Sequence, residues 1–283
     1  MSLFTTAAAR PQPQQKLIQQ FFEANKDHFS DLFQAGAFLR YLYTPNDGSW
    51  ALRPNGKTGT TSTLYFLFHL MFGYPLSAQA VVDNSLNEDQ AGHMLGRARV
   101  FSPLIARNDQ SKPSRYLKQT LKLTTVRHPM ARALSGFSYL CLSEELRHEM
   151  FFVDRVRMNA LVGFDWKSHA DTADGFVRFL TYLQHEIPHN DTRPLNGHFR
   201  PQLLNILPDV LQPDLVGRCE DLPAFFTEIA DRLSRPLPDG AVTAQARNVA
   251  QVTDRSALIT PEATRLVSEI FAGDFEAFGY DLL

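Results

Sequence analysis

The chain has 283 residues, and its 28 lysines and arginines nearly balance 30 aspartates and glutamates, giving a formal charge of −2. This balance argues against a protein dedicated to nucleic acids or anionic membrane surfaces, because such proteins show a clear basic excess. A strongly anionic ligand therefore requires a local site. Hydrophobic residues make up 44% of the chain, which is enough for a substantial core.

The cysteines and the apolar segments bear on the cellular compartment. Cys141 and Cys219 are the only cysteines and belong to no metal-ligand pattern, so we expect neither a disulfide framework nor a metal site. The N-terminus lacks a signal-peptide pattern. The most apolar run, residues 64–76, is far shorter than the roughly 20 residues of a membrane span. We therefore expect a cytoplasmic protein with no membrane span.

Helical periodicity, strand-like runs and turn residues predict the elements in chain order. Residues 1–15, rich in proline and glutamine, are expected to be a flexible tail. The expected elements that follow are helices at 17–22 and 31–43, a turn at 45–48, a strand at 49–53, a polar loop at 54–61, a buried helix ending near 72, a strand at 121–126, a helix from 129 to about 140, a strand at 214–218, a helix at 223–233 and a helix starting at 260–261.

Strands that alternate with helices are typical of α/β proteins. No linker or internal repeat divides the chain, so we predict one α/β domain over residues 16–283. Its expected architecture is a P-loop-like three-layer fold, in which a central and mainly parallel sheet is flanked by helices.

The most informative segment is the loop at residues 53–62, RPNGKTGTTS, between an expected strand and an expected helix. Backbone N–H groups and the helix dipole converge on an anion at such a junction. Glycines allow close approach of the backbone, Lys57 adds a charge, and several hydroxyls add donors. The segment therefore predicts a phosphate-like site.

Two nucleotide-binding interpretations fit this loop. Residues 51–58, ALRPNGKT, match a relaxed Walker A pattern with alanine in place of the first glycine, which indicates a P-loop kinase or NTPase. Such an enzyme also needs a second strand ending in an aspartate that helps to hold magnesium. The best second strand here runs instead into Arg127 and His128, which weakens this interpretation.

The segment KTGTTS at 57–62 resembles the 5′-phosphosulfate loop of PAPS-dependent sulfotransferases, and it is especially similar to the Golgi-type carbohydrate branch. TVRHP at 125–129, with Arg132 and Ser135, resembles their 3′-phosphate segment. Segments 198–202, 216–220 and 273–280 are similar to later parts of the same branch. The usual hydrophobic-Pro-Lys lead-in is altered here, and the missing membrane anchor suggests a soluble bacterial-type member.

The resemblance implies a sulfotransferase that moves a sulfuryl group from PAPS to a hydroxyl of a small-molecule or carbohydrate acceptor. It releases PAP and requires no metal. We expect no nucleic-acid partner, and the near-neutral charge favours a confined pocket. The residues implied in donor binding are Lys57, Thr58, Gly59, Thr60, Thr61, Ser62, Arg127 and Ser135.

Sulfuryl transfer builds negative charge on the departing 5′-phosphate, and Lys57 is the expected catalytic residue that stabilises it. The acceptor hydroxyl also needs a general base. Glu88 and His93 follow the helix after the loop, roughly where related enzymes place a catalytic carboxylate or imidazole. His198 is the third candidate and lies beside Arg200, which could bind an anionic acceptor. A non-catalytic binding protein of similar fold remains an alternative.

Overall fold

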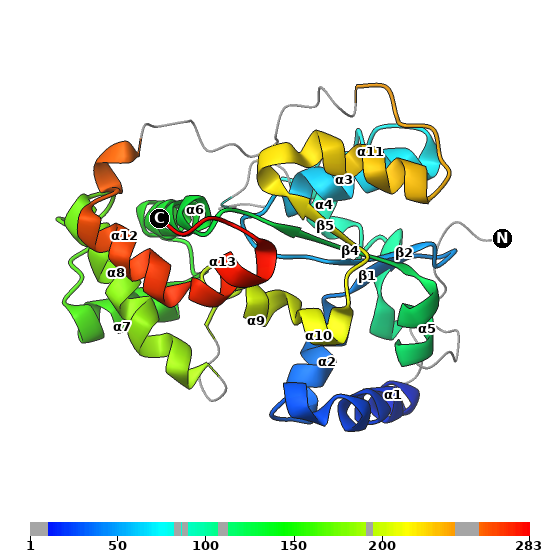
Figure 1. The fold of residues 1–283 in the computed structure, drawn as a ribbon, viewed down its shortest axis with the longest axis horizontal. Coiled ribbons are helices and arrows are strands. Elements are labelled where there is room, and N and C mark those ends of the chain that lie inside the picture. Colours follow the sequence, from blue (N-terminus) through cyan, green and yellow to red (C-terminus); the bar gives the residue numbers. More distant parts are fainter. Residues whose placement is uncertain (1–10, 82–85, 87–89, 107–112, 191–194, 241–254) are drawn as a thin grey trace.

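The computed structural model describes residues 11–81, 86, 90–106, 113–190, 195–240 and 255–283. Its five-stranded sheet has the order β3-β1-β2-β4-β5. The strands are β1 (Tyr43–Pro45), β2 (Trp50–Arg53), β3 (Phe101–Pro103), β4 (Leu121–Val126) and β5 (Leu215–Arg218). Helices cover both faces, with α3 and α11 on one side and α1, α2, α9 and α10 on the other (Figure 1).

The sheet is mixed, so the prediction of a mainly parallel sheet was wrong. Strands β2, β4 and β5 pair in parallel, whereas β1 pairs antiparallel with both β2 and β3. The reason lies in the turn at 45–48, where Gly48 N–H donates to the Pro45 carbonyl at 3.1 Å. A connection this short joins antiparallel strands. The turn therefore joins β1 and β2 as a hairpin, and β1 lies where the sequence predicts no strand.

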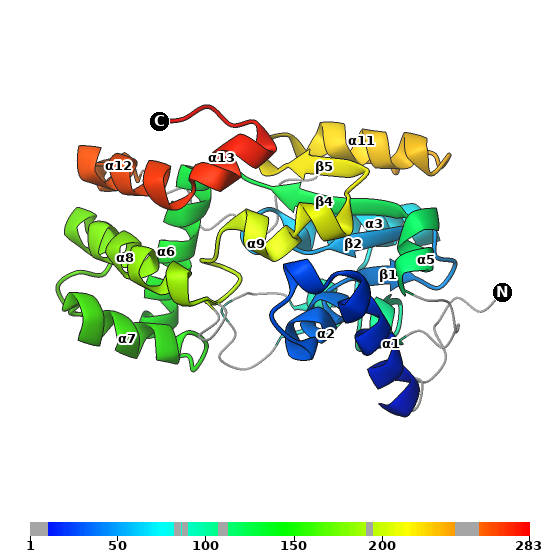
Figure 2. The same cartoon turned by 60° about the horizontal axis from the view of Figure 1, so that its bottom comes forward.

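The helices are more numerous than the sequence patterns predict. The helices of seven or more residues are α1 (Pro11–Ala24), α2 (Leu32–Arg40), α3 (Thr60–Phe72), α5 (Pro113–Gln119), α6 (Pro129–Glu145), α7 (Phe152–Val162), α8 (Ala173–Glu186), α11 (Leu222–Arg232), α12 (Pro261–Ile270) and α13 (Ala272–Phe278). Shorter helices are α4 (Ala91–Met94), α9 (Gln202–Ile206) and α10 (Pro208–Leu211). In Figure 2, helices α6, α7, α8 and α12 gather at one end of the molecule, beside the sheet.

Several predicted elements are confirmed. Strands β2, β4 and β5 and helices α3 and α11 lie within a residue or two of their expected bounds. Helix α3 ends as expected at Gly73, which has a φ of 77° and donates to the His69 carbonyl. Helix α12 begins as expected, because the Thr260 side chain accepts the Ala263 N–H. Helix α1 starts at Pro11, within the segment expected to be a tail, and α2 ends at Arg40.

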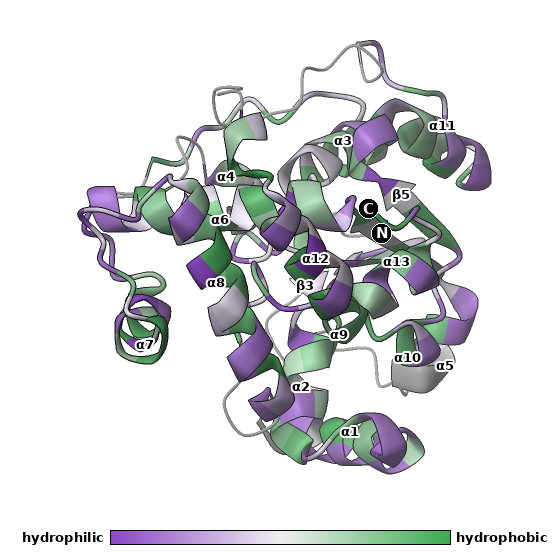
Figure 3. Cartoon of the chain, turned by 60° about the vertical axis from the view of Figure 1, so that its left-hand side comes forward, coloured by the Kyte–Doolittle hydropathy of each residue, from purple (hydrophilic) through white to green (hydrophobic). Residues whose placement is uncertain are grey.

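All four residues of β2 are buried, and successive side chains point to opposite faces, as expected in a sheet covered on both faces. Trp50 and Leu52 join a core cluster with α3 and α11, whereas Ala51 joins a second cluster with α1 and α2. A third cluster, rich in phenylalanine, contains Phe137 and Phe179 and fills the space between α6, α8 and α12. In Figure 3, α8 and α11 each carry hydrophobic and hydrophilic segments, as helices with one buried face do.

Within the ranges given above, no helix is long and apolar enough to cross a lipid bilayer.

Candidate functional site

The site lies where β2 and β4 end side by side. These strands are parallel neighbours, so the loop after Arg53 and the turn after Val126 emerge at the same edge of the sheet. Ligands of open α/β sheets bind at the carboxyl ends of the strands for this reason. Helix α3 follows the first loop and α6 follows the second, so the N-termini of both helices point toward the same region.

The loop at 53–62 reverses direction through two left-handed residues. Lys57 has a φ of 67° and Gly59 a φ of 83°. The conformation at Lys57 is uncommon for a residue with a side chain and costs about 1–3 kcal/mol, so the surrounding structure must hold it there. A Cβ atom at Gly59 would lie 2.8 Å from Leu222 Cδ1, so that position requires glycine.

Arg132 joins the loop to a distant segment of the chain. This guanidinium is 2% exposed and donates to the carbonyls of Gly56, Gly197 and Arg200 at 2.8–2.9 Å. At Gly56, a Cβ atom would lie 3.0 Å from the Gly197 carbonyl oxygen, so the absence of a side chain permits this close approach. The loop that carries Lys57 and the segment that carries His198 are therefore fixed against each other.

The hydroxyls of the loop divide into two groups. Thr58 is fully buried, and its hydroxyl bonds to the Asn55 carbonyl and to Thr125 Oγ1, both at 2.7 Å. Thr60 also donates to the Asn55 carbonyl, at 2.8 Å, although its side chain borders the cavity. Thr61 and Ser62 line the cavity. The Thr58 side chain thus stabilises the loop and does not face the cavity.

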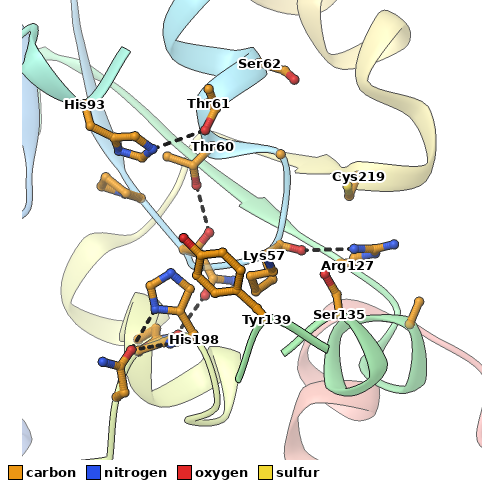
Figure 4. A pocket seen from close by; sticks show the side chains of 18 of the residues that line it. Lys57, Thr60, Thr61, Ser62, His93, Arg127, Ser135, Tyr139, His198 and Cys219 are labelled. Atoms are coloured by element: carbon orange, nitrogen blue, oxygen red, sulfur yellow. Dashed lines mark hydrogen bonds between the residues drawn. The ribbon is translucent and has the colours of Figure 1, made fainter. Parts of the chain in front are cut away.

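Lys57 carries the central charge of the site. Its ammonium lies 3.8 Å from the centre of the Tyr139 ring, a cation–π contact (Figure 4). Burial, together with the positive charges of Arg127, Arg255 and Arg132, lowers the pKa of Lys57 to about 8. These like charges in one place indicate a site for an anion.

Arg127 and Ser135 both line the cavity beside the Lys57 loop (Figure 4). The Arg127 guanidinium donates to the Lys57 carbonyl at 3.5 Å. The Arg127 backbone is held more tightly, since its N–H donates to Gln202 Oε1 at 2.9 Å and its carbonyl accepts from Gln202 Nε2 at 2.8 Å. The Gln202 N–H in turn donates to Asp274. Segments 198–202 and 273–280 therefore help to hold the Arg127 backbone in place.

The structure separates the three candidate bases. His198 lines the cavity, and its Nδ1 lies 2.7 Å from Asn196 Oδ1 (Figure 4). Because an amide oxygen only accepts, Nδ1 carries the proton and Nε2 retains its lone pair. Burial lowers the pKa of His198 to about 3, and the charges of Lys57, Arg132 and His93 act in the same direction. The imidazole is therefore neutral at physiological pH.

His93 also lines the cavity but is exposed to solvent. Its Nε2 lies 3.2 Å from the Thr61 hydroxyl, so it meets the N-terminal turn of α3 (Figure 4). Glu88 lies outside the described residues, and its predicted role stays a prediction.

These side chains border one cavity of about 1280 Å³. It is larger than the 300–1,000 Å³ of a usual small-ligand pocket, so it has room for two molecules. Lining residues that the motifs did not single out as site residues are Tyr41, Tyr43, Arg53, Phe101, Ser138, Tyr139, Glu145, Asn196, Asn205, Cys219 and Arg255. Among the residues given in Overall fold, no three His, Cys, Asp or Glu side chains cluster in a way that could hold a metal ion.

Comparison with known proteins connects this geometry to a family. The model of a family described as the sulfotransferase family matches residues 57–281. The match begins at Lys57 and includes residues 57–62 of the loop, Arg127, Ser135 and His198, but it leaves out the first part of the loop and β2, which ends at Arg53. A search of curated proteins and a search of solved structures each found no significant match.

Proposed function

The chain belongs to the sulfotransferase family, and we propose that it transfers a sulfuryl group from PAPS to a hydroxyl of a carbohydrate or another small acceptor. One observation carries the proposal: Lys57 and Arg127 border the same cavity at the ends of adjacent parallel strands. Within the described residues, no carboxylate forms an ion pair with either side chain. Their charges are thus available to an anionic substrate.

The residues present fit a donor with two separate anionic groups. Lys57, the N-terminal turn of α3 and Ser62 suit the 5′-phosphosulfate, because helix amides and a lysine together bind phosphate-like groups. Arg127 and Ser135 suit the 3′-phosphate, since a guanidinium binds phosphate with two parallel hydrogen bonds. The cavity volume leaves room for an acceptor beside the donor.

In the proposed reaction, the sulfur–oxygen bond to the 5′-phosphate breaks as a new sulfur–oxygen bond forms to the acceptor hydroxyl. The donor supplies the activated sulfuryl group. Lys57 stabilises the negative charge that develops on the departing phosphate oxygen, a role worth about 10²–10³-fold in rate for a single donor of this kind. Its contact with Tyr139 and its loop conformation hold it in place before reaction.

We assign the proton of the acceptor hydroxyl to Nε2 of His198. This nitrogen has a free lone pair because Nδ1 donates to Asn196, and the ring lies in the same cavity as Lys57. A pKa near 3 describes the protein without bound anions. A negatively charged donor beside Lys57 would offset the contribution of the neighbouring cations to this lowered pKa, whereas the larger contribution of burial remains.

The kinase or NTPase alternative has weaker support. Strand β4, the parallel neighbour of β2, is followed by Arg127 and His128, where that class needs an acidic residue for magnesium. The family match also favours sulfuryl transfer.

Transfer of ³⁵S-sulfate from labelled PAPS to a panel of glycans and small hydroxyl compounds tests the proposal. We expect a labelled product with wild-type protein and roughly 10²–10³-fold slower labelling with Lys57→Ala at the same protein concentration. A thermal shift with Mg-ATP but none with PAP would contradict it and would support the kinase alternative. A thermal shift with PAP but no transfer to any acceptor would support the non-catalytic alternative.

A further inference from the structure

A second pair of cations lies in the cavity apart from Lys57 and Arg127. Arg53, the last residue of β2, and Arg200, two residues after His198, both line the cavity. Asn205 accepts a hydrogen bond from the Nε atom of each arginine. Arg53 Nε donates to the Asn205 backbone carbonyl and Arg200 Nε donates to Asn205 Oδ1, each at 2.8 Å. Anchoring at Nε leaves the terminal nitrogens of Arg200 to face a ligand.

The surroundings of this pair supply no negative charge. Arg53 is only 6% exposed, and its other hydrogen bond runs to the Phe38 carbonyl, with the Phe38 ring 4.5 Å from the guanidinium. In the described part of the chain, no carboxylate forms an ion pair with Arg53 or Arg200. Burial lowers the pKa of Arg53 to about 9, and the charge of Arg200 adds to that effect. A buried and a half-buried cation that share Asn205 as a hydrogen-bond partner, without a counter-ion in the described part of the chain, favour binding of an anion.

The pair is distinct from the donor-binding residues. The charges that lower the pKa of Lys57 are those of Arg127, Arg255 and Arg132. The pKa of Arg53 is instead lowered by the charge of Arg200 and raised by Tyr41 and Tyr43. His198 lies on the same segment as Arg200 and senses the charge of Lys57. The proposed base thus lies on the chain segment that carries Arg200 and lines the same cavity as Lys57 and the Arg53–Arg200 pair.

Aromatic side chains, which we call the aromatic wall, line the cavity together with the arginine pair. Tyr41, directly after α2, and Tyr43, the first residue of β1, line the same cavity. Aromatic rings next to guanidiniums suit a ligand that has both a ring face and a negative charge. Tyr41, Tyr43 and Arg53 precede the residues that the family model matches, so this wall comes largely from a segment outside the shared region.

We propose that the acceptor is an anionic hydroxyl compound, and that Arg53 and Arg200 bind its carboxylate or sulfate while a hydroxyl faces His198. This inference rests on the proposed function and makes it more specific. An arginine that binds the anionic group with two hydrogen bonds fixes its position. The pair therefore favours acceptors in which the distance between the anionic group and the reacting hydroxyl matches the site.

The test compares matched acceptors that differ in one group: phenyl β-D-glucoside, phenyl β-D-glucuronide and phenyl β-D-glucoside 6-sulfate. Their binding to protein saturated with PAP is measured by calorimetry, so the readout does not depend on turnover. We expect at least one anionic member to bind roughly 10- to 100-fold more tightly than the neutral one, the range for a buried charge-assisted contact. The glucuronide and the sulfate distinguish the two sources of charge.

Arg200→Gln should remove this preference, and Arg200→Lys should restore part of it. The matched control is Arg255→Gln, which removes one charge from the other end of the cavity and should retain the preference. Arg200 is chosen over Arg53 because Arg53 is buried at the end of a central strand, and its loss threatens folding. Equal binding of all three acceptors by wild type, or a preference that survives Arg200→Gln, overturns the proposal. Absence of PAP binding would instead refute the proposed function.

Discussion

The two ends of the cavity, which we propose to bind the donor and the acceptor, differ in how the chain builds them. The donor end, formed by Lys57, Arg127 and Ser135, comes from two loop-to-helix junctions at the ends of parallel strands. The acceptor end, formed by Tyr41, Tyr43, Arg53 and Arg200, combines an antiparallel hairpin with a segment about 150 residues away, since Asn205 holds both arginines. The residues of the donor end thus lie in short sequence motifs after parallel strands. The residues of the acceptor end are distant in sequence and meet only in the folded chain.

The largest effect is expected at His198, which lines the cavity on the same segment as Arg200. His198→Ala should lower kcat by roughly 10²–10⁴-fold, the usual contribution of a general base, and leave PAP affinity unchanged. Single-turnover rates and PAP calorimetry measure both quantities. His93→Ala is the matched control, because His93 is an exposed histidine of the same cavity. A larger loss of kcat in His93→Ala than in His198→Ala would assign the base to His93.

Lys57→Ala should lower kcat by roughly 10²–10³-fold, because it removes the donor that stabilises the departing phosphate. Lys57→Arg keeps the charge and should recover part of the rate. Steady-state kinetics with saturating PAPS measure the effect. A change confined to the KM for PAPS would mean that Lys57 acts in ground-state binding only, which contradicts its assigned role.

Arg127→Ala should weaken PAP binding by about 2–4 kcal/mol, as for the loss of a charge-assisted contact in a desolvated site. Binding of 5′-AMP, which lacks the 3′-phosphate, should change little. Calorimetry with both nucleotides separates these outcomes. Equal losses for PAP and 5′-AMP would show that Arg127 supports the loop and does not bind the 3′-phosphate.

The pH dependence of kcat/KM for PAPS reports the donor end of the free enzyme. The protonated form of Lys57 binds the anion, and its pKa is lowered to about 8. The kcat/KM for PAPS should therefore be constant well below pH 8 and fall above it, by about tenfold for each pH unit once Lys57 is mostly deprotonated. Lys57→Arg should remove this alkaline decline. A decline that persists in Lys57→Arg would assign it to another group.

The smallest effects concern the loop threonines. Thr58→Val should lower the free energy of unfolding by about 1–3 kcal/mol, because it leaves the buried Thr125 hydroxyl without its partner. Thr61→Val should change stability by no more than about 0.5 kcal/mol. Denaturant unfolding of both variants measures the difference. Equal losses of stability would mean that the Thr58 hydrogen bonds contribute no more than a partly exposed residue does.

The donor end could be predicted from sequence because its residues lie at fixed spacings around strand ends. The loop pattern predicts Lys57, the resemblance to sulfotransferases adds Arg127 and Ser135, and the structure brings all three to one cavity. The motif did not reveal that Thr58 points away from that cavity, since a pattern of hydroxyls does not show which of them the fold buries. The individual roles of these residues remain predictions.

The acceptor end could not be predicted because its neighbours are distant in sequence. The sequence predicts a helix before the turn at 45–48 and no strand there. It therefore does not predict β1 or the antiparallel pairing that makes the sheet mixed. Arg200 was noted as a possible anion-binding residue, but its pairing with Arg53 depends on Asn205, which no spacing rule connects to β2. Short strands such as β3 also carry too few residues to show an alternating pattern.

A crystal structure of the protein with PAP bound tests the central claim most directly. It should place the 5′-phosphate within hydrogen-bond distance of Lys57 and the first turn of α3, and the 3′-phosphate on Arg127 and Ser135. His198 Nε2 should then face the side of the 5′-phosphate from which sulfur is transferred. A nucleotide bound elsewhere, or one whose 3′-phosphate lies on Arg53 and Arg200, would contradict the account.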